Sequence, residues 1–162
     1  MQYKRFEDLP VWRDSVELAR SIYEFAALDI FRRHPGLRDQ LERAALSISN
    51  NIAEGFERGT TNELLAFLYI ARGSAGEVRS MMRVLETWDI FGNYRSQISS
   101  FTVQCEKISK QLYGWIESLK NSEISGQRRL DDKAKNRYAN KKEREQFLEE
   151  LNRIRAKPDE KL

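Results

Sequence analysis

Two residue types that build most catalytic and metal sites are almost missing from this chain. It has one cysteine, Cys105, and one histidine, His34, among 162 residues. A lone cysteine excludes an internal disulfide framework and suits a reducing cytoplasm, and a di-iron bundle would need more than one histidine. Cys105 lies among apolar residues, and His34 lies in a His-Pro-Gly loop. We therefore expect a core residue and a loop residue, rather than a nucleophile and a general base.

Proline, long apolar runs and phosphate-binding loops are also scarce or missing. The 3 prolines leave the stretch between Pro35 and Pro158 free to be helical. No window approaches 18 uncharged apolar residues, and the first residues lack the apolar segment of a signal peptide. No glycine-rich strand-to-helix turn is present. These absences predict a cytoplasmic protein without membrane contact and without a cofactor.

Four carboxylates are the remaining candidates for a metal site, since they could in principle hold Mg²⁺. They are Glu54, Glu77, Glu86 and Asp89. Carboxylates on helices near glycines are more often hydrogen-bonded to Asn and Arg side chains. A helical ribonuclease site would need an arginine a few residues before the histidine, whereas Arg32 and Arg33 directly adjoin His34. We therefore predict no enzyme activity and no bound metal.

Apolar residues recur at helical spacing through four segments of the chain. We predict four helices, over residues 11–27, 37–58, 61–88 and 94–119. No segment alternates with a period of two, so a sheet is not expected. Short connections between amphipathic helices favour an all-α, antiparallel up-down-up-down four-helix bundle. The residues predicted to face its core are Trp12, Val16, Ala19, Tyr23, Ala26, Leu41, Ala45, Ile48, Ile52, Phe56, Leu64, Leu68, Ala71, Ala75, Val78, Met82, Leu85, Ile98, Phe101, Cys105, Ile108, Leu112, Trp115 and Leu119.

The most unusual part of the sequence is residues 47–77, which contain a helix end, a tight turn and a helix start. Four polar residues recur at i, i+4, i+7 and i+11, a spacing that places them on one helix face. They are Ser47, Asn51, Glu54 and Arg58. Gly59 is expected to be the left-handed residue that ends this helix. Thr60 followed by Glu63 fits a capping box that opens the next helix.

The run Gly-Ser-Ala-Gly at residues 73–76 removes side-chain bulk from one full helical turn. Two glycines inside a helix cost roughly 1 kcal/mol each relative to alanine, and close approach of another backbone usually compensates for them. That neighbour could be the first or fourth helix of the same subunit. It could also be another subunit, with Asn51 and Glu54 satisfying buried polar groups across the interface. Three aromatic residues expected to be exposed near one end add weight to assembly: Trp88, Phe91 and Tyr94.

The net charge of +3 is unevenly distributed along the chain. Residues 1–120 carry 16 Lys/Arg and 16 Asp/Glu, whereas residues 121–162 carry 12 Lys/Arg and 9 Asp/Glu. We therefore predict a neutral bundle over residues 1–120 and a basic C-terminal extension over residues 121–162. The apolar residues of the extension are few but keep helical spacing. Such a segment is either a solvated helix or partly disordered until it meets a partner.

The basic residues of the extension are candidates for contacts with a phosphate backbone. They are Arg128, Arg129, Lys133, Lys135, Arg137, Lys141 and Lys142. Tyr138 is available among them for stacking on a base. Interleaved acidic residues such as Asp131 and Glu143 leave a second interpretation open, in which the extension is only a solvated charged helix.

Four motifs in a fixed order give the chain a resemblance to a known family. They are Phe6-x-x-Leu9-x-Val11-Trp12, Leu37-x-x-Gln40, Ser47-Ile48-x-x-Asn51-Ile52-Ala53-Glu54-Gly55 and Ala71-x-Gly73-Ser74-x-x-Glu77. Over residues 4–120 the chain thereby resembles the 23S rRNA intervening-sequence protein family, also called S23. The resemblance implies a four-helix bundle that assembles as a ring-like homopentamer. It also implies a relation to the accessory variability protein of diversity-generating retroelements, which binds a reverse transcriptase and nucleic acid and catalyses nothing itself.

These observations lead to one hypothesis and one alternative. The hypothesis is a non-catalytic, homopentameric accessory or scaffold protein that associates with RNA or DNA and could assist a reverse transcriptase. The extension would supply the phosphate contacts. The alternative is a protein–protein adaptor that binds no nucleic acid itself and whose extension folds on its partner. The subunit interface would be formed by Asn51, Glu54, Gly73, Ser74, Gly76 and Glu77.

Overall fold

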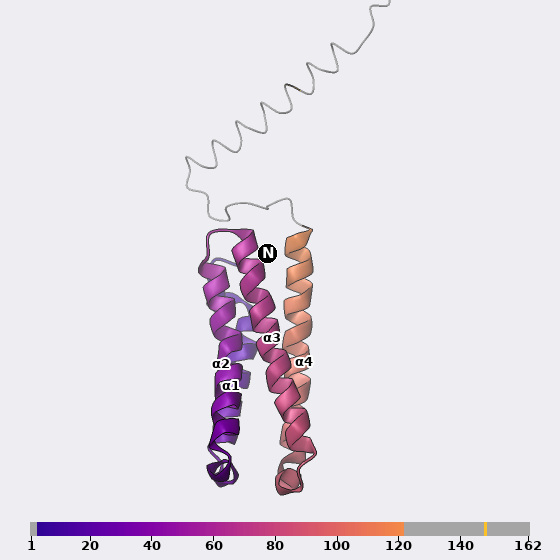
Figure 1. Ribbon diagram of the computed structural model, residues 1–162. Helices are drawn as coiled ribbons and strands as arrows, with labels where there is room; N and C mark the ends of the chain where they lie inside the picture. The colour runs from indigo at the N-terminus through magenta and orange to yellow at the C-terminus, as the bar shows by residue number, and fades with distance from the viewer. Residues whose placement is uncertain (1–2, 122–147, 149–162) are drawn as a thin grey trace, which may run out of the picture. The chain divides into compact units, whose positions relative to one another are not determined.

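Four long α-helices make up most of the described protein, as Figure 1 shows. The computed structural model describes residues 3–121 and Leu148. Its long helices are α1 (Pro10–Ala26), α2 (Pro35–Glu57), α3 (Thr61–Glu86) and α4 (Arg95–Lys120). Consecutive helices run antiparallel, with α1 and α3 each packed against both α2 and α4. The predicted all-α, up-down-up-down four-helix bundle is confirmed, and each helix begins and ends within two residues of its predicted bounds.

The chain divides into two compact units, Met1–Gly126 and Gln127–Leu162. The four-helix bundle lies in the first unit. In the second unit the structure describes only Leu148, which is helical and exposed. The predicted division at residue 120 and the partly helical character of the extension therefore stay predictions.

The connection between α2 and α3 combines one confirmed prediction with one error. Thr60 is the N-cap of α3, and its hydroxyl accepts a hydrogen bond from the Glu63 backbone N–H at 3.2 Å, which is the N-cap bond of the predicted capping box. The Glu63 carboxylate accepts a hydrogen bond from the Thr60 hydroxyl at 2.7 Å. The prediction that Gly59 is left-handed is wrong, because no glycine in the described residues has a positive φ. The chain leaves α2 through Arg58 instead, which has extended backbone angles of φ −67° and ψ 151°.

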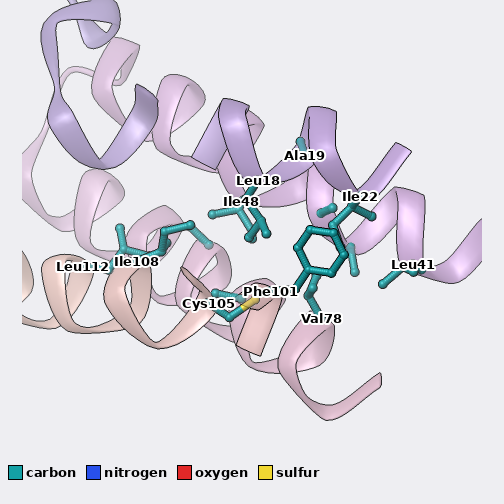
Figure 2. Packing of buried hydrophobic residues seen from close by; sticks show 14 of the residues in the cluster. Leu18, Ala19, Ile22, Leu41, Ile48, Val78, Phe101, Cys105, Ile108 and Leu112 are labelled. Atoms are coloured by element: carbon teal, nitrogen blue, oxygen red, sulfur yellow. The ribbon is translucent and has the colours of Figure 1, made fainter. Parts of the chain in front are cut away.

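A continuous hydrophobic core runs between the helices, and Figure 2 shows part of it. Side chains from all four helices meet in it, among them Ile22, Ile48, Val78 and Phe101. Every residue predicted to face the core from α2 and α3 is buried. In α4 the fully buried stripe reaches Ile116, whereas the predicted Trp115 and Leu119 are only half-buried at its edge.

In α1 the predicted core face is partly wrong. Val16 and Tyr23 were predicted to face the core but are 39% and 41% exposed. A neighbouring stripe with the same helical spacing is buried instead, because its leucine, isoleucine and phenylalanine remove more apolar surface from water. It comprises Val11, Ser15, Leu18, Ile22 and Phe25. Ser15 is accommodated there because its hydroxyl donates a hydrogen bond to the Val11 carbonyl at 2.6 Å.

The α1–α2 and α3–α4 connections share the sequence Asp-Ile-Phe, at residues 29–31 and 89–91. Each connection forms a 3₁₀ helix, Asp29–Arg33 and Asp89–Tyr94. Phe31 and Phe91 are both buried, and their ring centroids lie 5.3 Å apart. This repeat is too short to stand out in the sequence. Its two phenylalanines close one end of the core.

Burial of Phe91 corrects the prediction that three exposed aromatic residues lie at this end of the bundle. Tyr94 is half-buried as well and packs against Phe25, with ring centroids 5.8 Å apart. Trp88 alone matches the prediction, at 36% exposure, and its ring contacts His34. The 3₁₀ turn explains the difference because it carries Phe91 inward, toward Phe31. Two of the three aromatic residues are therefore not available as an exposed surface for assembly.

Gly55 allows a close approach between α2 and α3. A Cβ atom at this position would lie 2.7 Å from the Cβ of Phe67 and 3.2 Å from the Cδ1 of Leu64. No other glycine in residues 3–121 has a heavy atom of another element within 4 Å of such a position. Gly55 therefore has the packing role within the chain that was one of the two explanations left open for Gly73 and Gly76.

Candidate assembly surface

A hydrogen-bond network joins α2 to α3 along the predicted polar stripe. The hydroxyls of Ser47 and Ser74 lie 2.9 Å apart. The Asn51 side-chain amide donates to the Ser47 carbonyl at 2.7 Å and to the Ser47 hydroxyl at 2.9 Å. Ser74 is buried, and Ser47 and Asn51 are half-buried. The stripe thus brings two of the predicted interface residues, Asn51 and Ser74, into one connected cluster.

Two predicted interface carboxylates continue the surface beyond this cluster. Glu77 accepts a hydrogen bond from the Gln40 side chain across the α2–α3 seam. Glu54 forms an ion pair with Arg58 one turn further along α2, as the spacing of the stripe allows. Both acidic residues are exposed, so solvent screens the Glu54–Arg58 pair and its contribution to stability is small.

Gly73 and Gly76 lie beside the cluster with open space over both of them. No heavy atom lies within 4 Å of the position where either glycine would carry a Cβ atom. The explanation that α1 or α4 of the same subunit fills this space is therefore wrong for the described residues. The two glycines are three positions apart in α3, so they point about 60° apart around the helix. Ile70 lies about one helical turn before Gly73, and its apolar side chain is 51% exposed.

We call this surface the assembly face and define it by residues of two helices. It comprises Ser47, Asn51 and Glu54 of α2 and Ile70, Gly73, Ser74, Gly76 and Glu77 of α3. The sequence missed Ile70, because an isoleucine at helical spacing does not show by itself whether it faces the core or solvent. It also missed the direct link between Ser47 and Ser74, which are 27 residues apart.

The residues considered for catalysis or metal binding have other partners. Burial raises the pKa of the Cys105 thiol to about 12, which keeps it protonated within the core. Among the candidate Mg²⁺ ligands, Glu86 pairs with Arg83 at 2.9 Å, and Asp89 lies 4.0 Å from Arg95. Within the described residues, no cluster of three or more His, Cys, Asp or Glu side chains could hold a metal ion.

The seam between α1 and α4 carries an open groove of about 670 Å³ lined partly by Asp14, Lys107 and Gln111. Asp14 accepts a hydrogen bond from Gln111 at 2.6 Å and pairs with Lys107 at 2.9 Å. Desolvation would raise the pKa of Asp14, but the hydrogen bonds from Lys107 and Gln111 outweigh it and lower the pKa. Both partners come from α4, so this carboxylate ties α1 to α4.

The charges of the bundle largely compensate one another. Of its 16 Lys/Arg residues, 12 form an ion pair with a carboxylate in the described part of the chain. The four without one are Lys4, Arg33, Arg72 and Lys110. The basic residues predicted to bind nucleic acid, between residues 128 and 142, lie outside the described residues. None of the helices in residues 3–121 is long and apolar enough to cross a membrane.

Comparisons with known proteins agree with the architecture. A family model described as 23S rRNA-intervening sequence protein matches residues 7–114. The fold is similar to that of a protein of unknown function from the S23 ribosomal protein family of Bacteroides thetaiotaomicron VPI-5482. That similarity has a TM-score of 0.57 at 23% identity and covers 66% of this chain and 98% of the other. No curated protein matches the chain. Because the family model covers more than half of the sequence, from the start of the bundle well into α4, the chain belongs to the 23S rRNA-intervening sequence protein family.

Proposed function

We propose that this protein is a non-catalytic homo-oligomer, a pentamer, that acts as an accessory or scaffold protein on nucleic acid in the cytoplasm. The observation that carries the proposal is the open space at Gly73 and Gly76. Each glycine weakens α3 by roughly 1 kcal/mol relative to alanine, yet neither is used for packing within the described subunit. A neighbouring subunit that approaches α3 closely would account for both.

The composition of the assembly face supports the same proposal. Ser74 and Asn51 already have hydrogen-bond partners, so a neighbour could cover them without leaving buried donors unsatisfied. A neighbouring subunit would remove the exposed Ile70 side chain from water, and burial of apolar surface favours association. A face that meets a different face on the next subunit generates a closed ring when the rotation fits. The family resemblance supports five subunits in that ring.

Replacing Gly73 by leucine is expected to convert the pentamer into single chains of 19.1 kDa. The leucine side chain would project into space that is open in the subunit and hold the neighbouring backbone away. Light scattering after gel filtration measures the mass, and circular dichroism checks that the helices remain folded. Ser99→Leu, which adds the same side chain at an exposed position of α4, is the matched control and should leave the mass unchanged. A pentameric Gly73→Leu variant would show that this face meets no neighbour.

The nucleic-acid part of the proposal rests on the charge distribution. Residues 121–162 carry the whole net positive charge, and most basic residues of the bundle are already paired with carboxylates. We therefore place the principal phosphate contacts in the extension, with RNA or DNA as the ligand. Because most basic residues of the bundle are ion-paired, they also support a second candidate function, a protein adaptor whose partner could be a reverse transcriptase.

Binding of single-stranded RNA across a salt series separates these candidates. A full-length variant with Lys133, Lys135 and Arg137 all changed to glutamine should bind more weakly than the unchanged protein. Its log–log salt slope should fall by about 2 to 3, because each neutralised phosphate contributes about 0.7 to 0.9. The charge-matched control changes three ion-paired bundle arginines to glutamine and should bind normally: Arg5, Arg20 and Arg43. If the unchanged protein binds neither RNA nor DNA, the adaptor becomes the better proposal.

A further inference from the structure

We propose that the seam between α3 and α4 carries a second nucleic-acid contact, a stacking platform for unpaired bases formed by Tyr69, Arg72, Tyr113 and Lys120. This inference rests on the proposed function, since it names a further surface on which the bound nucleic acid would lie. It commits to a single strand as the ligand. The extension and the platform can be tested separately because they share no residue.

The platform consists of two tyrosine rings, each with a cation over it. Tyr69 on α3 is 45% exposed and Tyr113 on α4 is 51% exposed. The guanidinium carbon of Arg72 lies 5.1 Å from the Tyr113 ring centroid, and the Lys120 ammonium lies 5.7 Å from that of Tyr69. Each pair reaches from one helix to the other. Tyr69 and Arg72 are three positions apart on α3, so the two pairs are neighbours on the helix surface. The Lys120 ammonium also pairs with Glu117 at 2.9 Å, so Arg72 is the uncompensated cation of the platform.

The charge of Arg72 distinguishes it from most other arginines of the bundle. Arg72 is one of the four basic residues of residues 3–121 that have no ion pair with a carboxylate. Its Nε donates instead to the Ser109 hydroxyl at 3.4 Å, and its guanidinium lies over the Tyr113 ring. The side chain is thus held in place by groups that leave its positive charge uncompensated. Such an arginine can still contact a phosphate or stack on a base.

The two tyrosines contact side chains of the opposite helix but take no part in the hydrophobic core. The core already buries Phe25, Phe31 and Phe91 as its aromatic contacts, and neither Tyr69 nor Tyr113 belongs to it. Exposed aromatic side chains beside cations are the usual means by which proteins bind single strands, because every base has a face that can stack. In a duplex those faces are covered by neighbouring base pairs. The platform should therefore prefer single strands.

The test uses the full-length protein and a fluorescein-labelled single-stranded oligouridylate, with an RNA duplex of equal length as the comparison. Changing Tyr69 and Tyr113 to alanine should weaken single-strand binding roughly fivefold or more for each residue. Tyr113→Phe should bind normally because the ring is kept. Arg72→Gln should lower the log–log salt slope by about 0.7, the value for one single-strand phosphate.

Two controls keep the result specific to this surface. Tyr23→Ala removes a similarly exposed tyrosine from α1, and Arg33→Ala removes another unpaired arginine; both should leave affinity unchanged. Circular dichroism and light scattering confirm that each variant keeps its helices and its mass. These measurements ensure that weaker binding reports the lost side chain rather than lost structure.

The possible outcomes separate this inference from the proposed function. Normal binding by the tyrosine variants, together with loss of binding when Lys133, Lys135 and Arg137 are changed, would overturn the platform and leave the proposed function standing. Equal affinity for duplex and single strand would overturn stacking. Absence of binding by the unchanged protein would overturn both proposals and leave this surface to a protein partner. Loss of affinity in the tyrosine and Arg72 variants, with normal binding by Tyr23→Ala and Arg33→Ala, would establish the platform.

Discussion

Replacing Phe91 by alanine is expected to lower the free energy of unfolding by about 3–5 kcal/mol, the range for a fully buried phenylalanine. Phe91 is 0% exposed and its ring contacts those of Phe25 and Phe31, at centroid distances of 6.4 and 5.3 Å. Removal of the ring takes away these contacts and leaves a cavity at the end of the core. Urea unfolding followed by circular dichroism, at one fixed protein concentration, measures the loss.

The neighbouring Ile90 provides the matched control for this prediction. It belongs to the same 3₁₀ turn but is 54% exposed, so Ile90→Ala should change stability by no more than about 0.5 kcal/mol. A small loss for Phe91→Ala, or an equal loss for both variants, would contradict the inward position of Phe91. Phe31→Ala should resemble Phe91→Ala, because Phe31 has the corresponding place in the other turn.

Replacing Gly55 by alanine is expected to destabilise the bundle by about 1–3 kcal/mol, the usual range for overpacking in a core. The added Cβ would lie 2.7 Å from the Cβ of Phe67, an atom fixed directly to the α3 backbone. Rotation of a flexible side chain cannot relieve that contact, so α2 and α3 must move apart. Helix propensity alone would make the alanine variant more stable by about 1 kcal/mol. A loss of stability would therefore come from the contact between the helices.

Gly114→Ala tests whether the loss of stability expected for Gly55→Ala comes from the contact between helices. Gly114 is inside α4 and has no heavy atom within 4 Å of its added Cβ position. The alanine there should stabilise the protein by up to about 1 kcal/mol, through helix propensity alone. Opposite signs in thermal or urea unfolding are the expected result. Stabilisation by Gly55→Ala would show that α2 and α3 do not meet closely at this point.

Much of the candidate assembly surface could be predicted from the polar stripe. The spacing of Ser47 and Asn51 placed them on one helix face, and both belong to the observed hydrogen-bond network. The partner of Ser47 could not be predicted in the same way. Ser74 lies 27 residues from Ser47 in the sequence. The contact between them depends on the axial offset between α2 and α3. Periodicity describes the faces of a helix but does not define that offset.

The sequence by itself determined the fold class, the number and bounds of the helices, the core stripes of α2 and α3, and the cap at Thr60. These features depend on local periodicity and on contacts between residues within one turn, which the order of residues specifies directly. Such interactions need no knowledge of which helices become neighbours.

Only the tertiary structure decided which stripe of α1 faces the core and that Phe91 turns inward. It also decided that Gly55, rather than Gly73 or Gly76, is the glycine packed within the subunit. Each of these outcomes depends on the surfaces that neighbouring helices present. In α1 two stripes had acceptable spacing, and the three other helices buried the one with more apolar area. Contacts between residues far apart in the chain determine these features, and the sequence of a single helix does not specify such contacts.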